Sequence, residues 1–152
     1  MDNAYLLIGS NIQPEENIKK AIALIQAEMR IANISSVWES HAVGNNGPNF
    51  LNCVLVVETE LSIEVIKNQV IRNLENSLGR VRTNDKYAPR TIDVDLIVYN
   101  GQMIDPEICH RVFIAVPLAE LVPDFYCIDG GVTLKEAADT LKRKEFIRKW
   151  DL

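Results

Sequence analysis

The 152-residue chain contains few cysteines, few histidines and no excess of basic residues, and each shortage excludes a class of protein. Its three cysteines, Cys53, Cys109 and Cys127, are widely separated and show no C-x-x-C spacing, so neither a zinc site nor a disulfide framework is indicated. The two histidines, His41 and His110, have no partner at metal-ligand spacing. The formal net charge of −5 argues against general nucleic-acid binding, which needs a basic surface.

Long apolar runs and the common catalytic signatures are also missing. The N-terminus lacks a basic segment followed by a long apolar stretch, so we expect no signal peptide, no membrane span and a cytoplasmic protein. No G-x-x-x-x-G-K-[ST] phosphate-binding loop occurs, which excludes a Walker-type kinase as a simple interpretation. A G-x-S-x-G nucleophile motif is absent as well.

The remaining composition is that of an ordinary globular protein, with 47% apolar and 24% charged residues. The length fits a single domain, residues 1–152, that can bury a sizeable core. Helices are expected to begin at Pro14, which is followed by two acids, and after the capping residue Ser62. Apolar runs and alternation predict strands at residues 4–8, 31–40, 50–59 and 92–99.

This order of elements, β-α-β-β-α-β, is typical of the α+β class with a ferredoxin-like antiparallel sheet and helices on one face. Beyond Tyr99 we expect a short helix at residues 116–123 and a terminal helix at residues 133–143. These two helices would form a C-terminal helical extension.

The last predicted strand contains two aspartates where an apolar pattern is expected. Successive side chains of a strand point to opposite faces, so Asp93 and Asp95 share one face. Two carboxylates suit Mg²⁺, which keeps positions open for phosphate and water, and paired ions can clamp both oxygens of a phosphoryl transfer. The alternative is that both acids only form salt bridges. Aliphatic side chains alternate onto the other face, namely Ile92, Val94, Leu96 and Val98.

Two further groups of residues are consistent with a nucleotide and a flat ring as ligands. Four cations precede the aspartates in an acidic protein, at Arg80, Arg82, Lys86 and Arg90. Guanidinium groups bind phosphate oxygens, although a solvated loop is the alternative interpretation. Phe50 and Asn52 share a strand face and could stack on and hydrogen-bond a heterocycle, although a strand Phe is more often a core residue. Glu75 departs from its helix's aliphatic stripe and could be solvated or approach a cation.

Four stretches of the chain together resemble one protein family. "YLLIGSN", "GPNFLNCVLVVET", "LGRVR" and "APRTIDVDLIVYNG" resemble the 6-hydroxymethyl-7,8-dihydropterin pyrophosphokinases of folate biosynthesis. The likeness runs from Tyr5 to Asp124, and the block from Pro89 to Val98 is the family's specific signature. The resemblance implies a ferredoxin-like fold, two Mg²⁺ ions, and transfer of diphosphate from ATP to the pterin's hydroxymethyl group with release of AMP. ATP and the pterin would be its partners, and we expect a monomer.

The resemblance also implies roles for individual residues. The catalytic residues would be Arg80, Arg82, Arg90, Asp93 and Asp95, with Asp93 and Asp95 holding the metal ions. The nucleotide would contact Glu75, Arg82, Arg90 and Arg111. The pterin would contact Ser40, Val43, Gly44, Phe50, Asn52, Tyr87, Asp95 and Phe113.

The chain departs from the family pattern at two places. His41 stands where the family usually has a proline. The segment from Gly101 to Arg111 is shorter than usual and has His110 without the proline that normally follows the family's histidine. This segment motivates one alternative, a catalytically weakened homologue that binds pterin or nucleotide. Another Mg²⁺-dependent nucleotidyl or phosphoryl transferase is the second alternative, because a fold does not determine a function.

Overall fold

The computed structural model describes residues 2–44, 47–80, 84, 91–128 and 130–152. Expectations for Arg82, Lys86, Tyr87 and Arg90 therefore concern positions outside the described residues. The strands are β1 (Asp2–Ser10), β2 (Arg30–Ile34), β3 (Val37–Ser40), β4 (Phe50–Thr59), β5 (Asp93–Tyr99), β6 (Gln102–Met103), β7 (Tyr126–Cys127), β8 (Val132–Thr133) and β9 (Ile147–Trp150). The helices are α1 (Pro14–Glu28), α2 (Ile63–Val65), the π-helical segment η1 (Ile66–Ile71), α3 (Arg72–Ser77), α4 (Val112–Leu121) and α5 (Leu134–Lys144).

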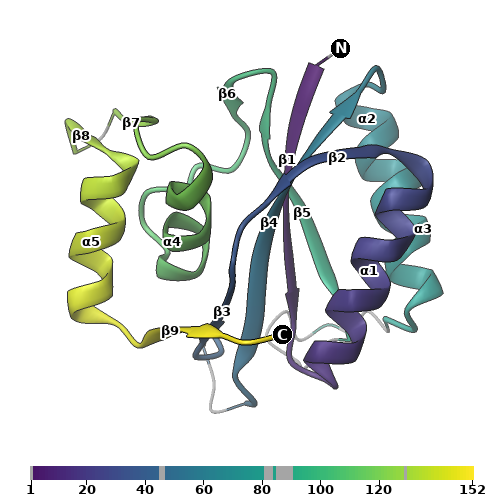
Figure 1. Cartoon of the computed structure of the whole chain (residues 1–152), viewed down its shortest axis with the longest axis horizontal. Coiled ribbons are helices and arrows are strands. Elements are labelled where there is room, and N and C mark those ends of the chain that lie inside the picture. The colour runs from purple at the N-terminus through teal and green to yellow at the C-terminus, as the bar shows by residue number, and fades with distance from the viewer. Residues whose placement is uncertain (1, 45–46, 81–83, 85–90, 129) are drawn as a thin grey trace.

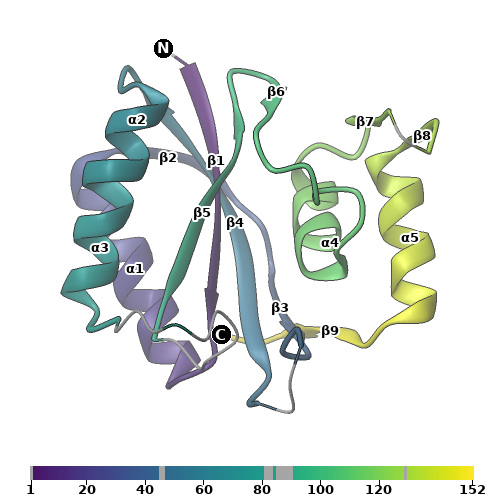
Figure 2. The ribbon, with the colours of Figure 1, turned by 180° about the vertical axis from the view of Figure 1, so that it is seen from behind.

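In the described part of the chain, seven strands form one antiparallel sheet in the order β6-β5-β1-β4-β3-β9, with β2 also paired to β4. Figures 1 and 2 show helices on both sides of this sheet. α1 and the run from α2 to α3 cover one face, and α4, with α5 packed against it, covers the other. The predicted α+β class and antiparallel sheet are confirmed, and the C-terminal extension supplies the second helical layer. Among the described residues, no helix is both long and apolar enough to span a bilayer.

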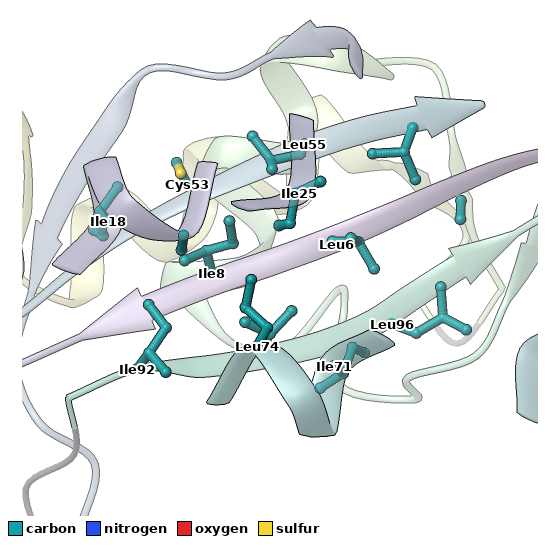
Figure 3. Close-up of a cluster of buried hydrophobic side chains, with 14 of the residues drawn as sticks. Leu6, Ile8, Ile18, Ile25, Cys53, Leu55, Ile71, Leu74, Ile92 and Leu96 are labelled. Atoms are coloured by element: carbon teal, nitrogen blue, oxygen red, sulfur yellow. The ribbon is translucent and has the colours of Figure 1, made fainter. Parts of the chain in front are cut away.

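The core between the sheet and α1–α3 follows directly from the apolar periodicities. Leu6 and Leu55 of neighbouring strands belong to one cluster with Ile18 and Ile25 of α1, and Leu74 of α3 completes it (Figure 3). All but Leu74 are at most 1% exposed. Each such side chain contributes roughly 1.5–3 kcal/mol relative to its exposed state. This core holds the two central strands rigidly under the site described below.

The alternation predicted for β5 holds only as far as Leu96. Val94 and Leu96 belong to the core beneath α1 and α3, whereas Val98 is buried in the second core beneath α4. The register with β1 shifts at this point, and Ile97 is the extra residue. A bulge places two residues opposite one, so the side chains after it point to the opposite face of the sheet. The prediction that Val98 shares a face with Val94 and Leu96 was therefore wrong.

The region predicted as one strand at residues 31–40 is two strands, and β9 was not predicted. The backbone N–H of Ser35 donates to the carbonyl of Val54, and Ser35 Oγ accepts from the N–H of Val54, both at 2.9 Å. These two bonds replace regular pairing with β4 at the point between the end of β2 and the start of β3. β9 continues the sheet beyond β3, with Ile147 opposite Ser40. Its four residues are too few to show a period, so only the pairing identifies it as a strand.

Two of the cysteines form a disulfide bond, which contradicts the expectation that no disulfide is present. Cys109 and Cys127 are joined with their Cα atoms 6.1 Å apart, while Cys53 is free and buried. The bonded residues precede and follow α4, so the return of the chain after this helix brings them together. A spacing of 18 residues matches no sequence motif, which explains why the pair was missed.

We expect the variant Cys127→Ser to be less stable than the oxidised wild type by about 3 kcal/mol. The bond closes an 18-residue loop, and in the chain-entropy model a loop of this size stabilises the folded state by about that amount. Urea unfolding of the variant, compared with the oxidised and the reduced wild type, measures the difference. Cys53→Ala provides a comparison that leaves the bond intact. Equal stabilities for oxidised and reduced wild type would contradict the prediction.

Candidate active site

A cavity of about 210 Å³ opens where β1, β3, β4 and β5 meet the start of α4. It brings together six of the residues proposed to contact the pterin, namely Ser40, Val43, Phe50, Asn52, Asp95 and Phe113. Asp93 and Arg111 line it as well. Gly44 is described but does not line it. These six residues span 73 positions of the sequence, from Ser40 to Phe113, and line the same cavity.

The floor of this cavity depends on Gly9, which the sequence reasoning did not select. Gly9 of the central strand lies opposite Asn52 on one side and opposite Asp93 on the other. A Cβ atom at this position would stand 3.2 Å from Asn52 Oδ1 and 3.5 Å from a ring carbon of Phe50. The absence of a side chain therefore leaves room between the amide and the acids. The signal available in the sequence was the family-like stretch "YLLIGSN", which contains Gly9.

Asn52 is buried and held in a single orientation. Its Nδ2 donates to Ser40 Oγ at 2.8 Å and to the carbonyl oxygen of Trp38 at 3.3 Å. These bonds occupy both amide hydrogens and leave Oδ1 beside Gly9 as an acceptor. Phe50 from β4 and Phe113 from α4 line the same cavity. Two aromatic rings and an oriented amide are suited to a flat heterocycle with N–H donors.

The acids of β5 lie beside a buried ion pair. Arg80 Nη1 is 3.0 Å from Asp93 Oδ1 and also pairs with Glu75 Oε2. The same Glu75 oxygen accepts the backbone N–H of Val94 at 3.2 Å, and the Glu75 side chain is almost fully buried. Glu75 therefore approaches a cation, one of the two options the sequence left open. It ties the end of α3 to β5, and neither it nor Arg80 lines this cavity or the second one described below.

The pKa of Asp95 is shifted by its surroundings. Its side chain is open to solvent at the cavity, while the protein packed on its other sides removes it from bulk water. This desolvation, followed by the negative charges of Asp93, Asp105 and Glu75, raises the pKa of Asp95 to about 7, and Arg80 opposes the rise. The acids thus carry more negative charge than Arg80 compensates, which favours binding of a cation.

The residues present fit a magnesium ion held jointly with a ligand. Among the described residues no group of three or more His, Cys, Asp or Glu side chains is arranged to hold a metal. Asp93 and Asp95 nevertheless line one cavity and offer only oxygen donors. Mg²⁺ is commonly bound by one or two carboxylates, with the remaining positions filled by phosphate oxygens and water. A phosphate-bearing ligand would therefore have to complete the coordination.

A second cavity, of about 340 Å³, lies on the other side of Asp95. Its apolar wall includes Leu96 and Ile104, and Lys67 and Asp105 add charge. Asp105 belongs to the short segment before α4, where its Oδ1 accepts the N–H of Glu107 at 2.8 Å. No motif marked Lys67 or Asp105 in the sequence, and His110 lines neither cavity. Because Asp95 lines both cavities, ligands bound in the two would approach each other at its carboxylate.

Comparison with known proteins points to a single family. The family model of 7,8-dihydro-6-hydroxymethylpterin-pyrophosphokinase (HPPK) matches residues 5–123. The 2-amino-4-hydroxy-6-hydroxymethyldihydropteridine pyrophosphokinase of Bacillus subtilis is 30% identical over 160 aligned positions, covering 97% of this chain and 89% of that protein. The protein of the same name from Methylorubrum extorquens is 32% identical, covering 90% of this chain and 92% of that protein.

Solved structures agree on the fold. The crystal structure of Plasmodium falciparum HPPK-DHPS with SDX-DHP superposes with a TM-score of 0.70 at 14% identity, covering 93% of this chain. The chain spans only 44% of that longer protein. At this identity the likeness establishes the ferredoxin-like fold, while the family model and the bacterial relatives establish the lineage. The chain therefore belongs to the 7,8-dihydro-6-hydroxymethylpterin-pyrophosphokinase family.

Proposed function

We propose that this protein transfers diphosphate from ATP to the hydroxymethyl group of 6-hydroxymethyl-7,8-dihydropterin in folate biosynthesis, giving AMP and the pterin diphosphate. Membership of the family supports the reaction. The observation that carries it in this chain is the position of Asp95, which lines both cavities. Two substrates bound on either side of one carboxylate would be held next to each other, and such positioning is the main requirement of a phosphoryl-transfer site.

The pterin is assigned to the smaller cavity. Phe50 and Phe113 offer aromatic faces, and Asn52 Oδ1 is oriented to accept an N–H of the ring. Such donors and acceptors fix the orientation of a flat ring and so direct its hydroxymethyl group. Asp95, at the border of the two cavities, would then lie near that group.

ATP is assigned to the larger cavity, with its phosphates toward Asp95. The apolar wall around Leu96 and Ile104 suits the base. Arg111 lines the smaller cavity at the start of α4 and would contact phosphate oxygens that extend past Asp95 toward the pterin. Asp93 and Asp95 would hold two Mg²⁺ ions. Bound Mg²⁺ would supply charge neutralisation of the polyphosphate. Arg82 and Arg90, outside the described residues, are proposed as further phosphate contacts and Tyr87 as a pterin contact.

Arg80 has a positioning role in this proposal. Glu75 holds its guanidinium beside Asp93, so a positive charge stands at the acids before any ligand arrives. An acid held in place in this way needs no reorganisation when a cation binds. We further propose that the protein acts as a monomer in the cytoplasm, where its substrate ATP is available. Light scattering with and without substrates would test the monomer.

The test of the reaction is the identity of the nucleotide product. The purified protein is incubated with ATP, MgCl₂ and 6-hydroxymethyl-7,8-dihydropterin, and the products are separated by chromatography. AMP formed only when the pterin is present is the expected result. ADP would indicate a different phosphoryl transfer. Pterin binding without turnover would support the alternative of a weakened homologue.

We expect Gly9→Ala to raise the KM for the pterin about 10-fold, because a methyl group of this kind is worth roughly 1–3 kcal/mol in a binding pocket. The new Cβ would press on Asn52 Oδ1 at 3.2 Å and fill the cavity floor. Steady-state kinetics with each substrate varied in turn measures the effect. Gly130→Ala is the matched control, since its Cβ meets only Val132 at an ordinary 3.6 Å. An unchanged pterin KM would show that the ring binds elsewhere.

A further inference from the structure

The imidazole of His41 is held at the edge of the smaller cavity by contacts from two directions. His41 lines this cavity, although family resemblance suggested a proline at the position. Its ring stacks on Phe146, with centroids 4.5 Å apart and planes inclined by 24°. Its Nδ1 lies 3.1 Å from Asn49 Oδ1. An exposed side chain fixed in this way has lost rotational freedom before any ligand binds.

A chain of hydrogen bonds determines which ring nitrogen of His41 carries hydrogen. Arg148 Nε donates to Glu39 Oε1 at 2.5 Å, and Asn49 Nδ2 donates to Glu39 Oε2 at 3.4 Å. Because a carboxylate only accepts, the amide of Asn49 must present its NH₂ group to Glu39 and its Oδ1 to His41. Nδ1 of His41 must then be the donor. In the neutral imidazole, Nε2 is left as an acceptor for a ligand.

The C-terminal strand β9 and the residue before it supply two of the contacts that hold His41: the ring of Phe146 and the bond from Arg148 to Glu39. β9 pairs with β3 so that Arg148 lies opposite Glu39 and Ile147 opposite Ser40. Phe146 immediately precedes β9, and the pairing therefore delivers its ring to His41. Residues at the end of the chain thus reach the wall of a cavity built mainly from its first 113 residues.

We propose that His41 is a further pterin-binding residue, whose Nε2 accepts a hydrogen bond from an N–H group of the ring, and that Phe146 is its positioning residue. This inference rests on the proposed function. The pterin ring offers several N–H donors, and Asn52 Oδ1 is oriented to bind one of them. Asn52 Oδ1 on β4 and His41 Nε2 directly after β3 would then accept hydrogen bonds from two N–H groups of one flat ring. The C-terminal segment then contributes to substrate recognition.

A double-mutant cycle on pterin affinity tests the proposal. The Kd for the pterin is measured with Mg²⁺ and a non-hydrolysable ATP analogue for the wild type, His41→Ala, Phe146→Ala and the double variant. We expect His41→Ala to weaken binding about 10-fold, the upper range for one neutral hydrogen bond. Phe146→Ala should weaken it about 5-fold, the size of one ring contact. The double variant should match His41→Ala, because Phe146 acts through the imidazole.

Further variants separate positioning from general structure. Phe146→Tyr should bind like the wild type, and Phe146→Leu keeps apolar volume without the ring if the alanine variant fails to fold. Leu152→Ala is the matched control, since Leu152 is 44% exposed and Phe146 38%. For Leu152→Ala, the Kd for the pterin and the Kd for the ATP analogue should each change by less than about 2-fold, within the ordinary scatter of surface substitutions. For Phe146→Ala, the Kd for the ATP analogue should likewise change by less than about 2-fold.

The outcomes are distinct. If the double variant lost affinity by the product of the two single losses, Phe146 would not act through His41, and its positioning role would be overturned. The same would follow if Phe146→Ala weakened pterin binding and nucleotide binding equally. Unchanged pterin affinity in His41→Ala would overturn the binding role of His41 while leaving the proposed function intact. A wild-type protein that neither binds nor converts the pterin would overturn the proposed function and this inference with it.

Discussion

Turnover in the variant Asp95→Asn is expected to fall by at least about 10³-fold, equivalent to roughly 4 kcal/mol of lost transition-state stabilisation. Asp95 lines both cavities, so its carboxylate lies where the proposed substrates meet. The amide has nearly the same shape but cannot supply the negative charge that binds a cation. Single-turnover measurement of AMP release separates this loss from slow product release. Asp124→Asn, at an exposed residue away from the cavities, should retain wild-type turnover.

Asp95→Asn should also stabilise the metal-free protein at high pH. This result would show that the loss of turnover does not come from a folding defect. The pKa of Asp95 is about 7 in the folded state, compared with roughly 3.9 for an unperturbed aspartate. The folded state therefore binds the proton more tightly, and stability is lost as pH rises from about 4 to 7. Asparagine stays uncharged, so the gain in stability of Asp95→Asn over the wild type is largest above pH 7 and vanishes near pH 4.

Urea unfolding in EDTA at pH 8 and pH 5 measures this difference. We expect a gain of about 1 kcal/mol at pH 8, reduced from the full linkage value because solvent at the open side of the cavity screens the charge. A variant less stable than the wild type at pH 8 would contradict the electrostatic account of Asp95. The lost turnover would then have to be attributed to altered structure.

The second large effect is expected for Glu75→Ala, which should lower the free energy of unfolding by about 3 kcal/mol, the lower end for breaking a buried ion pair. Glu75 is 2% exposed, and its removal leaves Arg80 without this partner and the N–H of Val94 without its acceptor. Arg80 would also be freed from one of its two anchors beside Asp93, so kcat should fall as well.

Comparison with Glu75→Gln separates the two contributions of this carboxylate. Glutamine keeps an acceptor for Val94 but loses the charge opposite Arg80, so its loss of stability should be smaller than that of alanine. Asn76→Ala, at the exposed neighbouring residue, should change stability by less than about 0.5 kcal/mol. Urea unfolding at pH 7 measures all three variants. An alanine variant as stable as the wild type would show that Arg80 and Val94 find other partners.

Elements with strong local signals were determined by the sequence itself. The longest strand, Phe50–Thr59, has the predicted bounds, and the first helix begins at Pro14 as predicted. Ser62 caps its helix, accepting the N–H of Val65 at 3.2 Å. Asp93 and Asp95 share a face and line one cavity, as alternation predicted. In each case the signal is a period or a cap that lies within a few residues and needs no distant partner.

Only the tertiary structure decided the features that depend on distant pairing. Three such features join segments that are far apart in the sequence, so no local pattern predicts them. They are the bulge at Ile97, the bond between Cys109 and Cys127, and the pairing of Ile147 with Ser40. The same holds for Gly9, which becomes the cavity floor only because strand register sets it between Asn52 and Asp93. Register is fixed by the packing of whole faces against the core. The sequence by itself therefore determined the acids of the site, and the packing of the sheet decided what surrounds them.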